Sequence, residues 1–418
     1  MRTVLAIASL LSVLTLSAQR ECSSVTYIQK ERTSNRTVQK SMEDADAFIR
    51  SQVFNNTRTS VAQAIAATNT IKIPVVIHVL YNSEALNISQ AQIESQLKVL
   101  NDDFRRRNSD SINTPDRFKP FAADANIEFV LATADPKGRV TTGIIRKQTS
   151  VAYFTTDDKI KFSNQGGDDA WDSKSYLNIW VGSLRKVLGY SSAPGGAADK
   201  DGVVITTSAF GTINTAAPYN LGRTAVHEVG HYLGLKHIWG DAACGDDGIQ
   251  DTPTQSSYTT GCPSGFRSTC NNGSLGDMYM NYMDFTNDVC LNLFTEGQKT
   301  AMRSLFNAGG PRASLLSSKG LNSPWLEEAA LPAEIITNTN TISLFPNPAT
   351  SVININFNND ASWMNQELKI VNMMGATMQK VLVSSTLQTI SIASLKPGIY
   401  MIQGEAAGKK LMQKLVKL

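Results

Sequence analysis

Residues 227–237 read His-Glu-Val-Gly-His-Tyr-Leu-Gly-Leu-Lys-His, and three of the four histidines in the 418-residue chain lie within this stretch. On a helix, side chains four residues apart share one face, so His227 and His231 can direct imidazole nitrogens at one metal ion. Glu228, the residue after the first histidine, would lie beside that ion as a base. The stretch therefore predicts two metal ligands and a proton acceptor on one helix.

A third ligand requires the chain to turn back, because a catalytic zinc takes three protein ligands and leaves a fourth position open to water. Gly234 can adopt the positive φ that ends a helix, and the chain can then bring His237 to the same ion. The helix itself is predicted over 221–233 from its apolar residues. The alternative is a histidine-rich helix that merely packs in a core, and the length of the pattern disfavours it.

A three-histidine zinc site of this kind predicts peptide-bond hydrolysis. The ion would polarise the scissile carbonyl and lower the pKa of its water, while Glu228 accepts the water proton and passes it to the leaving amine. A structural zinc finger would be closed to water and would have no use for the glutamate. The alternative function is a non-catalytic extracellular surface binding protein with an inert metal site. Glu228 argues against it, since such a site needs ligands but no positioned base.

A methionine-bearing turn further along the chain points to a family. Residues 281–285 read Asn-Tyr-Met-Asp-Phe, and together with the histidine motif they resemble the pappalysin group of the metzincin metallopeptidases. Met283 then corresponds to the methionine beneath the metal, with Met278 and Met280 as alternatives. The group usually carries a tyrosine where this chain has Phe285, so no tyrosine role is carried over. Further blocks that carry the resemblance are Ile73–Tyr81, Leu177–Val181, Asp201–Ile205 and Phe294–Gln298.

The resemblance implies an α+β catalytic domain over 59–310, with a twisted mixed sheet, a backing helix, the active-site helix and a loop-rich C-terminal subdomain. It also implies a calcium-binding loop at Asp247, Asp251 and Thr252, since oxygen-rich loops suit hard cations; a solvated acidic turn is the alternative. Asp288 would give a preference for Arg, and sometimes Lys, after the scissile bond, because a buried carboxylate pairs well with a guanidinium. An exposed loop aspartate is the alternative interpretation of that residue.

The five cysteines favour an exported protein in an oxidising compartment. Four of them lie around the acidic loop and the methionine turn, where two disulfides could brace loops that have little core of their own. Spacing leaves three pairings open. The resemblance favours Cys244–Cys270 and Cys262–Cys290.

The fifth cysteine, Cys22, lies near the N-terminus. A thiolate is a strong zinc ligand, so Cys22 could take the open position and hold a precursor inactive. Precursors of the pappalysin group resemble this arrangement, with an arginine two residues before the cysteine, here Arg20. The alternatives are an unpaired thiol in a disordered tail and a lipoprotein anchor. The anchor is disfavoured because residues 19–21 are not small and apolar.

Residues 1–18 have the pattern of a secretory signal peptide, with Arg2 ahead of an apolar stretch and small residues at its end. That stretch is too short to span a bilayer, and no other run reaches about 20 apolar residues. Residues 19–58 are polar and charged, with little periodicity to suggest a core, and are interpreted as a propeptide. Arg58–Thr59 is a natural maturation point, and cleavage there could be autocatalytic.

The catalytic region is expected to open with an apolar strand over 73–80, in which His78 is interpreted as structural. A helix from Ser89, with Gln92 completing a capping box, should pack behind the sheet. Further strands are predicted at 127–131, 177–181 and 203–206. We expect a mixed sheet with the active-site helix on the side opposite the backing helix.

Residues 311–341 have the composition of a linker, and residues 342–418 read as a small β-sandwich. Its strands are predicted at 352–357, 368–372, 389–392, 399–403 and 411–416. Leu344–Ala349, Leu395–Tyr400 and Lys414–Leu418 resemble the C-terminal sorting domain of the type IX secretion system, which implies recognition by bacterial secretion machinery. A carbohydrate- or surface-binding sandwich is the alternative.

The net charge of +3, with Lys and Arg scattered along the chain, gives no basis for nucleic-acid binding. A signal peptide, paired cysteines and a sorting domain together predict a secreted or cell-surface protein without a transmembrane segment. We expect a monomer made as a latent precursor, whose partners are protein or peptide substrates and whose cofactors are catalytic zinc and structural calcium.

Overall fold

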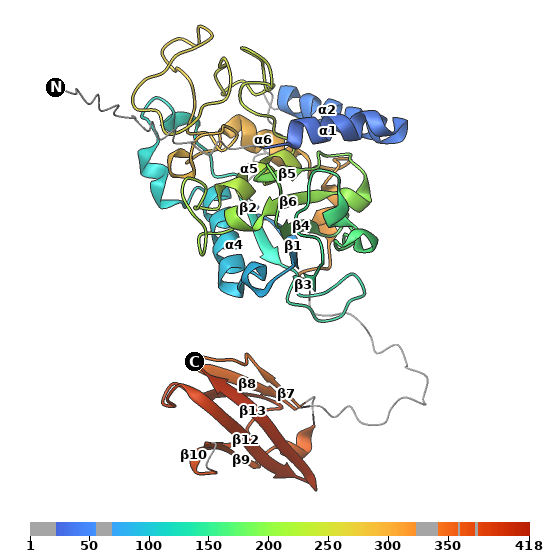
Figure 1. Cartoon of the computed structure of the whole chain (residues 1–418), viewed down its shortest axis with the longest axis vertical. Coiled ribbons are helices and arrows are strands. Elements are labelled where there is room, and N and C mark those ends of the chain that lie inside the picture. Colours follow the sequence, from blue (N-terminus) through green and yellow to red (C-terminus); the bar gives the residue numbers. More distant parts are fainter. Residues whose placement is uncertain (1–21, 56–68, 323–341, 358–359, 373–374) are drawn as a thin grey trace, which may run out of the picture. The chain divides into compact units, whose positions relative to one another are not determined.

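The computed structural model describes residues 22–55, 69–322, 342–357, 360–372 and 375–418. The chain divides near residue 326 into an N-terminal and a C-terminal unit (Figure 1). The predicted signal peptide, Arg20, the Arg58–Thr59 bond and residues 323–341 of the predicted linker lie outside the described residues.

A mixed sheet forms the centre of the N-terminal unit, as the sequence predicted, and it has six strands, of which β3 and β5 were not predicted. Its strands follow the order β2-β1-β4-β6-β5, and β3 pairs with the far end of β1. All pairings are parallel except that of β5 with β6. β5 is therefore an edge strand that runs against the rest. The bounds are β1 Ile71–Tyr81, β2 Ile127–Leu131, β3 Ile144–Gln148, β4 Leu177–Gly182, β5 Gly189–Ser191 and β6 Gly202–Thr206.

Three helices pack on one face of this sheet: α4 (Gln90–Phe104), α5 (Arg223–Tyr232) and α6 (Glu296–Ser304). Ser89 caps α4 by accepting a hydrogen bond from the backbone of Gln92 at 3.1 Å. Apolar side chains of all three helices share one core with the alternate residues of β1 that include Val75 and Ile77. The sheet thus contributes one side chain in two to this core, as its pleat requires.

The expectation that α4 and α5 lie on opposite sides of the sheet is wrong. Both contribute to the same core, and the side-chain amide of Gln96 on α4 donates to the carbonyl of Gly222 at the start of α5 at 3.0 Å. The other face of the sheet, which includes Val76, Trp180 and Val204, is covered largely by loops. Helical periodicity shows which side of a helix is buried, but it does not show which face of a sheet the helix covers.

The segment interpreted as a propeptide, in which the sequence showed little periodicity, forms two helices, α1 (Ser24–Ser34) and α2 (Arg36–Asn55), which lie side by side near β5 and α6 (Figure 1). On α2, Met42 and Ala45 are buried, while Ile49 and Val53 pack against the main core. These four positions share one helical face. The stripe is narrow and lies among charged residues, so composition concealed it.

Between α5 and α6 the described chain is mostly loop, with a short 3-10 helix, η9 (Asp288–Cys290). Disulfides join Cys244 to Cys270 and Cys262 to Cys290, the pairing that the resemblance implied.

The predicted linker begins later than the sequence suggested, because residues 311–322 pack on the N-terminal unit. Arg312 is buried and donates to Asp201 at 2.8 Å, and Leu315 joins the main core. The mixture of Ser, Pro, Ala and Asn that suggested a linker did not reveal that two buried side chains hold this stretch in place.

The C-terminal unit is a sandwich of a four-stranded sheet, β10-β9-β12-β13, and a three-stranded sheet, β11-β8-β7. Ile353 and Ile355 from one sheet pack with Ile370, Ile402 and Leu415 from the other. The predicted strands are present, and β7 and β10 are additional. The bounds are β7 Ser343–Phe345, β8 Val352–Asn356, β9 Glu367–Asn372, β10 Thr377–Leu382, β11 Leu387–Ser391, β12 Gly398–Ala406 and β13 Lys409–Lys417. Across the described parts of the chain, no helix combines the length and apolar character that crossing a bilayer requires.

Candidate metal centre

The histidine motif lies on a short helix that ends where the sequence predicted. Helix α5 covers Arg223–Tyr232, and Gly234 has a φ of +82°, in the left-handed region that favours glycine. The backbone N–H of Leu235 donates back to the carbonyl of Gly230 at 3.0 Å, which closes the last turn. The chain then leaves the helix axis and returns with His237.

The three histidines face one another through their Nε2 atoms. These atoms lie 3.2 Å apart for His227 and His231, 3.2 Å for His227 and His237, and 3.1 Å for His231 and His237. All three side chains are buried. Helical spacing brings the first two together, and the turn at Gly234 adds the third.

Each Nδ1 atom has a partner elsewhere in the protein. His227 Nδ1 lies 2.7 Å from the carbonyl oxygen of Tyr282, and His231 Nδ1 lies 2.9 Å from that of Leu235. His237 Nδ1 lies 2.5 Å from Asp241 Oδ1. An oxygen acceptor requires the proton on Nδ1, which leaves a lone pair on each Nε2.

This donor set fits a cation. Three lone pairs that converge at about 3 Å repel one another unless a positive ion lies between them, and neutral imidazoles are the form that binds a metal. Burial lowers the pKa of His231 to about 3 and also lowers the pKa of His237, which favours the neutral rings. Burial and donor chemistry therefore agree on a metal site built from these three residues.

The N-terminal segment reaches the same centre through Cys22. One ligand atom from each of Cys22, His227, His231 and His237 lies within 4.8 Å of the others. Burial, together with the nearby carboxylate of Glu228, raises the pKa of the Cys22 thiol. A fourth donor therefore stands beside the three imidazoles, more than 200 residues away in the sequence.

Glu228 is buried and contacts this segment. Its Oε2 atom accepts a hydrogen bond from Ser24 Oγ at 2.6 Å and lies 3.6 Å from Cys22 Sγ. Cys22 also pairs with Gly189 on β5, where an added Cβ would lie 2.9 Å from Glu228 Cγ. The edge strand β5 therefore passes directly over the glutamate, and the N-terminal segment adds to it. Sequence reasoning missed Ser24, since nothing local links it to Glu228.

Met283 lies under the active-site helix. It is fully buried, and its sulfur lies 2.5 Å from the place where a Cβ at Gly230 would stand. The side chain of Asn281 accepts from the backbone N–H of Met283 at 2.9 Å and holds the turn. The next residue back in the turn, Tyr282, supplies the carbonyl for His227. Met278 and Met280 are also buried, but the contact with the helix at Gly230 is made by Met283.

Two residues beyond the motif support His237 and were not predicted. Trp239 stacks on its ring with centroids 4.2 Å apart and 8° between planes, and Asp241 accepts a hydrogen bond from its Nδ1–H group. Phe285 meets the same ring edge-on at 4.8 Å. A carboxylate four residues after the third histidine was the available sequence signal for Asp241.

Asp288, the predicted substrate-binding residue, is buried. Its Oδ2 atom accepts hydrogen bonds from the backbone of Leu221 at 2.9 Å and of Arg223 at 3.3 Å. The carboxylate thus stabilises the first turn of α5, where a negative charge is favoured.

The side chains of the predicted calcium loop are all hydrogen-bonded to groups of the protein. Asp247 Oδ1 accepts from the backbone of Ile249 at 2.9 Å and from Thr252 Oγ1 at 2.8 Å. Asp251 accepts from Thr295 Oγ1 at 2.6 Å and from the backbone of Gly297 at 2.8 Å. Within the described residues, the histidine centre is the one group of three or more His, Cys, Asp or Glu side chains that could hold an ion.

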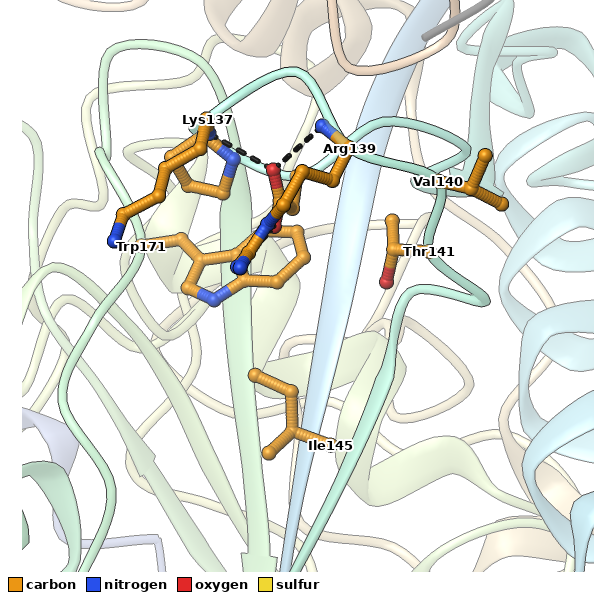
Figure 2. A pocket seen from close by; sticks show the side chains of 8 residues that line it. Lys137, Arg139, Val140, Thr141, Ile145 and Trp171 are labelled. Atoms are coloured by element: carbon orange, nitrogen blue, oxygen red, sulfur yellow. Dashed lines mark hydrogen bonds and ion pairs between the residues drawn. The ribbon is translucent and has the colours of Figure 1, made fainter. Parts of the chain in front are cut away.

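A cavity of about 640 Å³ lies away from the metal centre (Figure 2). It is lined by Ile145 and Trp171 among others, and Trp171 packs with the residues on the sheet face opposite α5. Asp135, which also lines the cavity, accepts hydrogen bonds from the backbone of Lys137 and Arg139, both at 2.9 Å. None of the predicted site residues lines this cavity.

Three converging imidazoles beside a carboxylate are the active-site groups of a metallopeptidase. Comparison with known proteins places the chain in that class. Residues 161–307 match the family described as pregnancy-associated plasma protein-A, the pappalysins. An extracellular metalloprotease of Colletotrichum graminicola is 32% identical over 254 residues, which cover 58% of this chain and 79% of that protein. An extracellular metalloprotease of Pyricularia oryzae is 32% identical over 268 residues, or 59% of this chain and 82% of that protein.

Solved structures agree. Mature mirolysin of Tannerella forsythia in complex with a cleaved peptide is 51% identical, with a TM-score of 0.59, over 60% of this chain and 96% of that one. A promirolysin variant of the same organism is 46% identical, with a TM-score of 0.65, over 71% of this chain and 97% of that one. The chain belongs to the pappalysin family of metallopeptidases. Residues 343–418 match the secretion system C-terminal sorting domain, so this is a secreted or cell-surface metallopeptidase.

Proposed function

We propose that the protein is a zinc-dependent endopeptidase of the metzincin type, made as a latent precursor. His227, His231 and His237 hold the zinc, and Glu228 is the catalytic base. The observation that carries the proposal is the convergence of three buried Nε2 atoms whose Nδ1 atoms are all occupied, with a carboxylate beside them. Zinc bound there would supply a Lewis acid for the scissile carbonyl and make a water molecule more acidic.

The residues around the zinc have separate tasks in this mechanism. Glu228 takes the proton of the attacking water and delivers it to the departing amine, a role that a buried carboxylate one residue from a ligand can fill. Tyr282, Leu235 and Asp241 keep the imidazoles in one tautomer through their Nδ1 atoms. Met283 forms the floor beneath α5.

Latency follows from the N-terminal segment, which we interpret as a propeptide that begins after the signal peptide and ends near Arg58. Cys22 takes the ligand position that catalysis would leave to water, and Ser24 binds the Oε2 atom of Glu228. The base and the open position are therefore blocked together. A precursor form, promirolysin, among the solved relatives supports this proposal.

Asp288 is proposed to select Arg, or Lys, after the scissile bond. The support is a buried carboxylate at the start of the active-site helix, whose charge would pair with a guanidinium. A structural calcium ion at the loop of Asp247, Asp251 and Thr252 is also proposed, and its support is the resemblance of this loop to the calcium loop of the family rather than the side-chain contacts. The catalytic domain would span 59 to about 322, because Arg312 and Leu315 pack on it, and the sorting domain would span 342–418.

The test is cleavage of a peptide mixture by processed protein, read by mass spectrometry. The matched variant is Glu228→Gln, which keeps the shape and the hydrogen-bonding oxygen but not the basicity. We expect cleavage to fall by about 10²- to 10⁴-fold, as for loss of a general base, with zinc content unchanged. Cleavage that survives both this change and a chelator would refute the mechanism.

A further inference from the structure

The N-terminal segment has a second attachment to the catalytic unit, away from the metal. Tyr27 on α1 is buried, and its hydroxyl donates to Asp158 Oδ1 at 2.8 Å. The ammonium group of Lys161, on the short 3-10 helix η5 (Lys159–Lys161), donates to the same hydroxyl at 2.9 Å. The tyrosine ring lies 4.8 Å from that of Tyr190 on β5. The phenol of Tyr27 therefore donates to one side chain, accepts from another and packs against an aromatic ring.

Lys161 is a fully buried cation, which is rare unless it is paired. Its Nζ atom contacts Asp158 at 3.1 Å and the carbonyl oxygen of Lys200 at 2.8 Å. It also lies 4.6 Å from the Tyr27 ring centroid and 5.0 Å from that of Tyr190. Tyr27 thus supplies one hydrogen bond and one of the aromatic faces around this charge.

This attachment and the metal centre lie on opposite faces of the sheet. Along β5, Gly189 faces Glu228, whereas the next residue, Tyr190, packs with Trp180, Val204 and Tyr27 on the other face. Alternation along a strand produces that separation. The N-terminal segment therefore contacts both faces of the edge strand β5: Cys22 lies on the face of the metal centre, and Tyr27 lies on the opposite face.

The chemistry of the site selects a phenol. Burial raises the pKa of Tyr27, so its hydroxyl stays protonated and donates to Asp158 while it accepts from Lys161. Phenylalanine would fill the same space but would leave the ammonium and the carboxylate each short of one partner. A site built to hydrogen-bond a hydroxyl discriminates strongly against the analogue that lacks it.

We propose that the catalytic unit has a tyrosine-binding site formed by Asp158, Lys161 and Tyr190, which Tyr27 occupies in the precursor. After cleavage, the N-terminal segment still binds the mature enzyme through this site and inhibits it. The inhibition part rests on the proposed function. The binding part does not, since the site contains no metal ligand.

The experiment uses mature protein from natural processing and a synthetic peptide of residues 19–55. Calorimetry measures binding to protein with zinc and to protein stripped of it, and peptide cleavage measures inhibition. Tyr27→Phe in the peptide should raise the dissociation constant roughly 10- to 100-fold, the loss expected for hydrogen bonds to charged groups. The matched control is Gln29→Ala, an exposed change on the same helix, which should alter it less than about twofold.

A second variant, in the enzyme, identifies the partner. Lys161→Met keeps the volume of the buried side chain and should remove most of the difference between the Tyr and Phe peptides. If this protein does not fold, Asp158→Asn serves instead, because Asn tolerates the positive φ of +67° at that position. Equal binding of the two peptides, or a difference that persists in the enzyme variant, would overturn the proposal. Protein that cleaves nothing but still prefers the Tyr peptide would contradict the proposed function and support the binding site.

Discussion

Asp241 offers the sharpest test of how the metal centre is supported. Its Oδ1 atom lies 2.5 Å from His237 Nδ1, and its side chain is 26% exposed, so water screens the contact only in part. Asp241→Asn keeps an oxygen acceptor and removes the charge. The backbone there has a φ of +59°, which Asn tolerates and Ala does not, so the amide variant introduces no strain of its own.

The expected loss follows from the charge on the acceptor. A hydrogen bond to a charged group contributes about 1.5–3 kcal/mol and a neutral one about 0.5–1.5 kcal/mol. The difference, about 1–1.5 kcal/mol, corresponds to roughly a tenfold weaker zinc affinity, at the lower end of the range measured for partners of ligating histidines.

Competition between the processed protein and a chromophoric zinc chelator measures this affinity directly. Asp246→Asn is the matched control, since it removes one exposed charge from the same loop and keeps an oxygen that can accept from the backbone N–H of Gly248. Its affinity should stay within about twofold of the parent. An Asp241→Asn protein that binds zinc as tightly as this control would show that the carboxylate does not support His237.

Three further predictions concern the N-terminal segment, the helix floor and substrate choice. Burial raises the pKa of Glu31 on α1 to about 7 from its ordinary 4.5, so the docked segment holds a proton that the free one releases. Binding of the N-terminal segment is then strongest below pH 4.5, and its binding free energy weakens by about 3 kcal/mol as the pH rises through 7. Calorimetry of the peptide across this pH range should show the decrease, and Glu31→Gln in the peptide should remove most of it. Gly230→Ala places a Cβ 2.5 Å from the sulfur of Met283 and should lower the free energy of unfolding in urea by about 1–3 kcal/mol. An unchanged urea midpoint would show that the turn around Met283 moves to make room without loss of stability. Asp288→Asn keeps an oxygen that accepts from the start of α5, so the stability of the protein should change little. The preference for Arg over an apolar residue after the scissile bond should fall about 10- to 100-fold in fragment profiles. A variant that keeps this preference would show that another residue selects the substrate.

Local patterns predicted the parts of the site that neighbouring residues build. His227, Glu228 and His231 follow from helical spacing, and His237 follows from a glycine that can end the helix. The apolar strands were predictable because β1 and β4 are buried on both faces and read as continuous apolar runs. The strands of the C-terminal sandwich were predictable from a different pattern, the alternation of apolar and polar residues.

The helices of the N-terminal segment were harder to predict. The stripe of Met42, Ala45, Ile49 and Val53 occupies one narrow face among charged residues, and helix α2 contacts α1, α6 and the main core. Propensity alone does not reveal a helix that is stabilised chiefly by packing.

The sequence by itself determined the chemistry that we propose for this protein: which side chains would bind a metal, which one would act as a base, and which stretches form strands. Tertiary structure alone decided that α4 and α5 share one face of the sheet, that Ser24 reaches Glu228 across 204 positions, and that Tyr27 meets Asp158 and Lys161. The reason is that ligand spacing on one helix is a property of backbone geometry, whereas contacts between distant segments depend on how all the apolar surfaces are buried together.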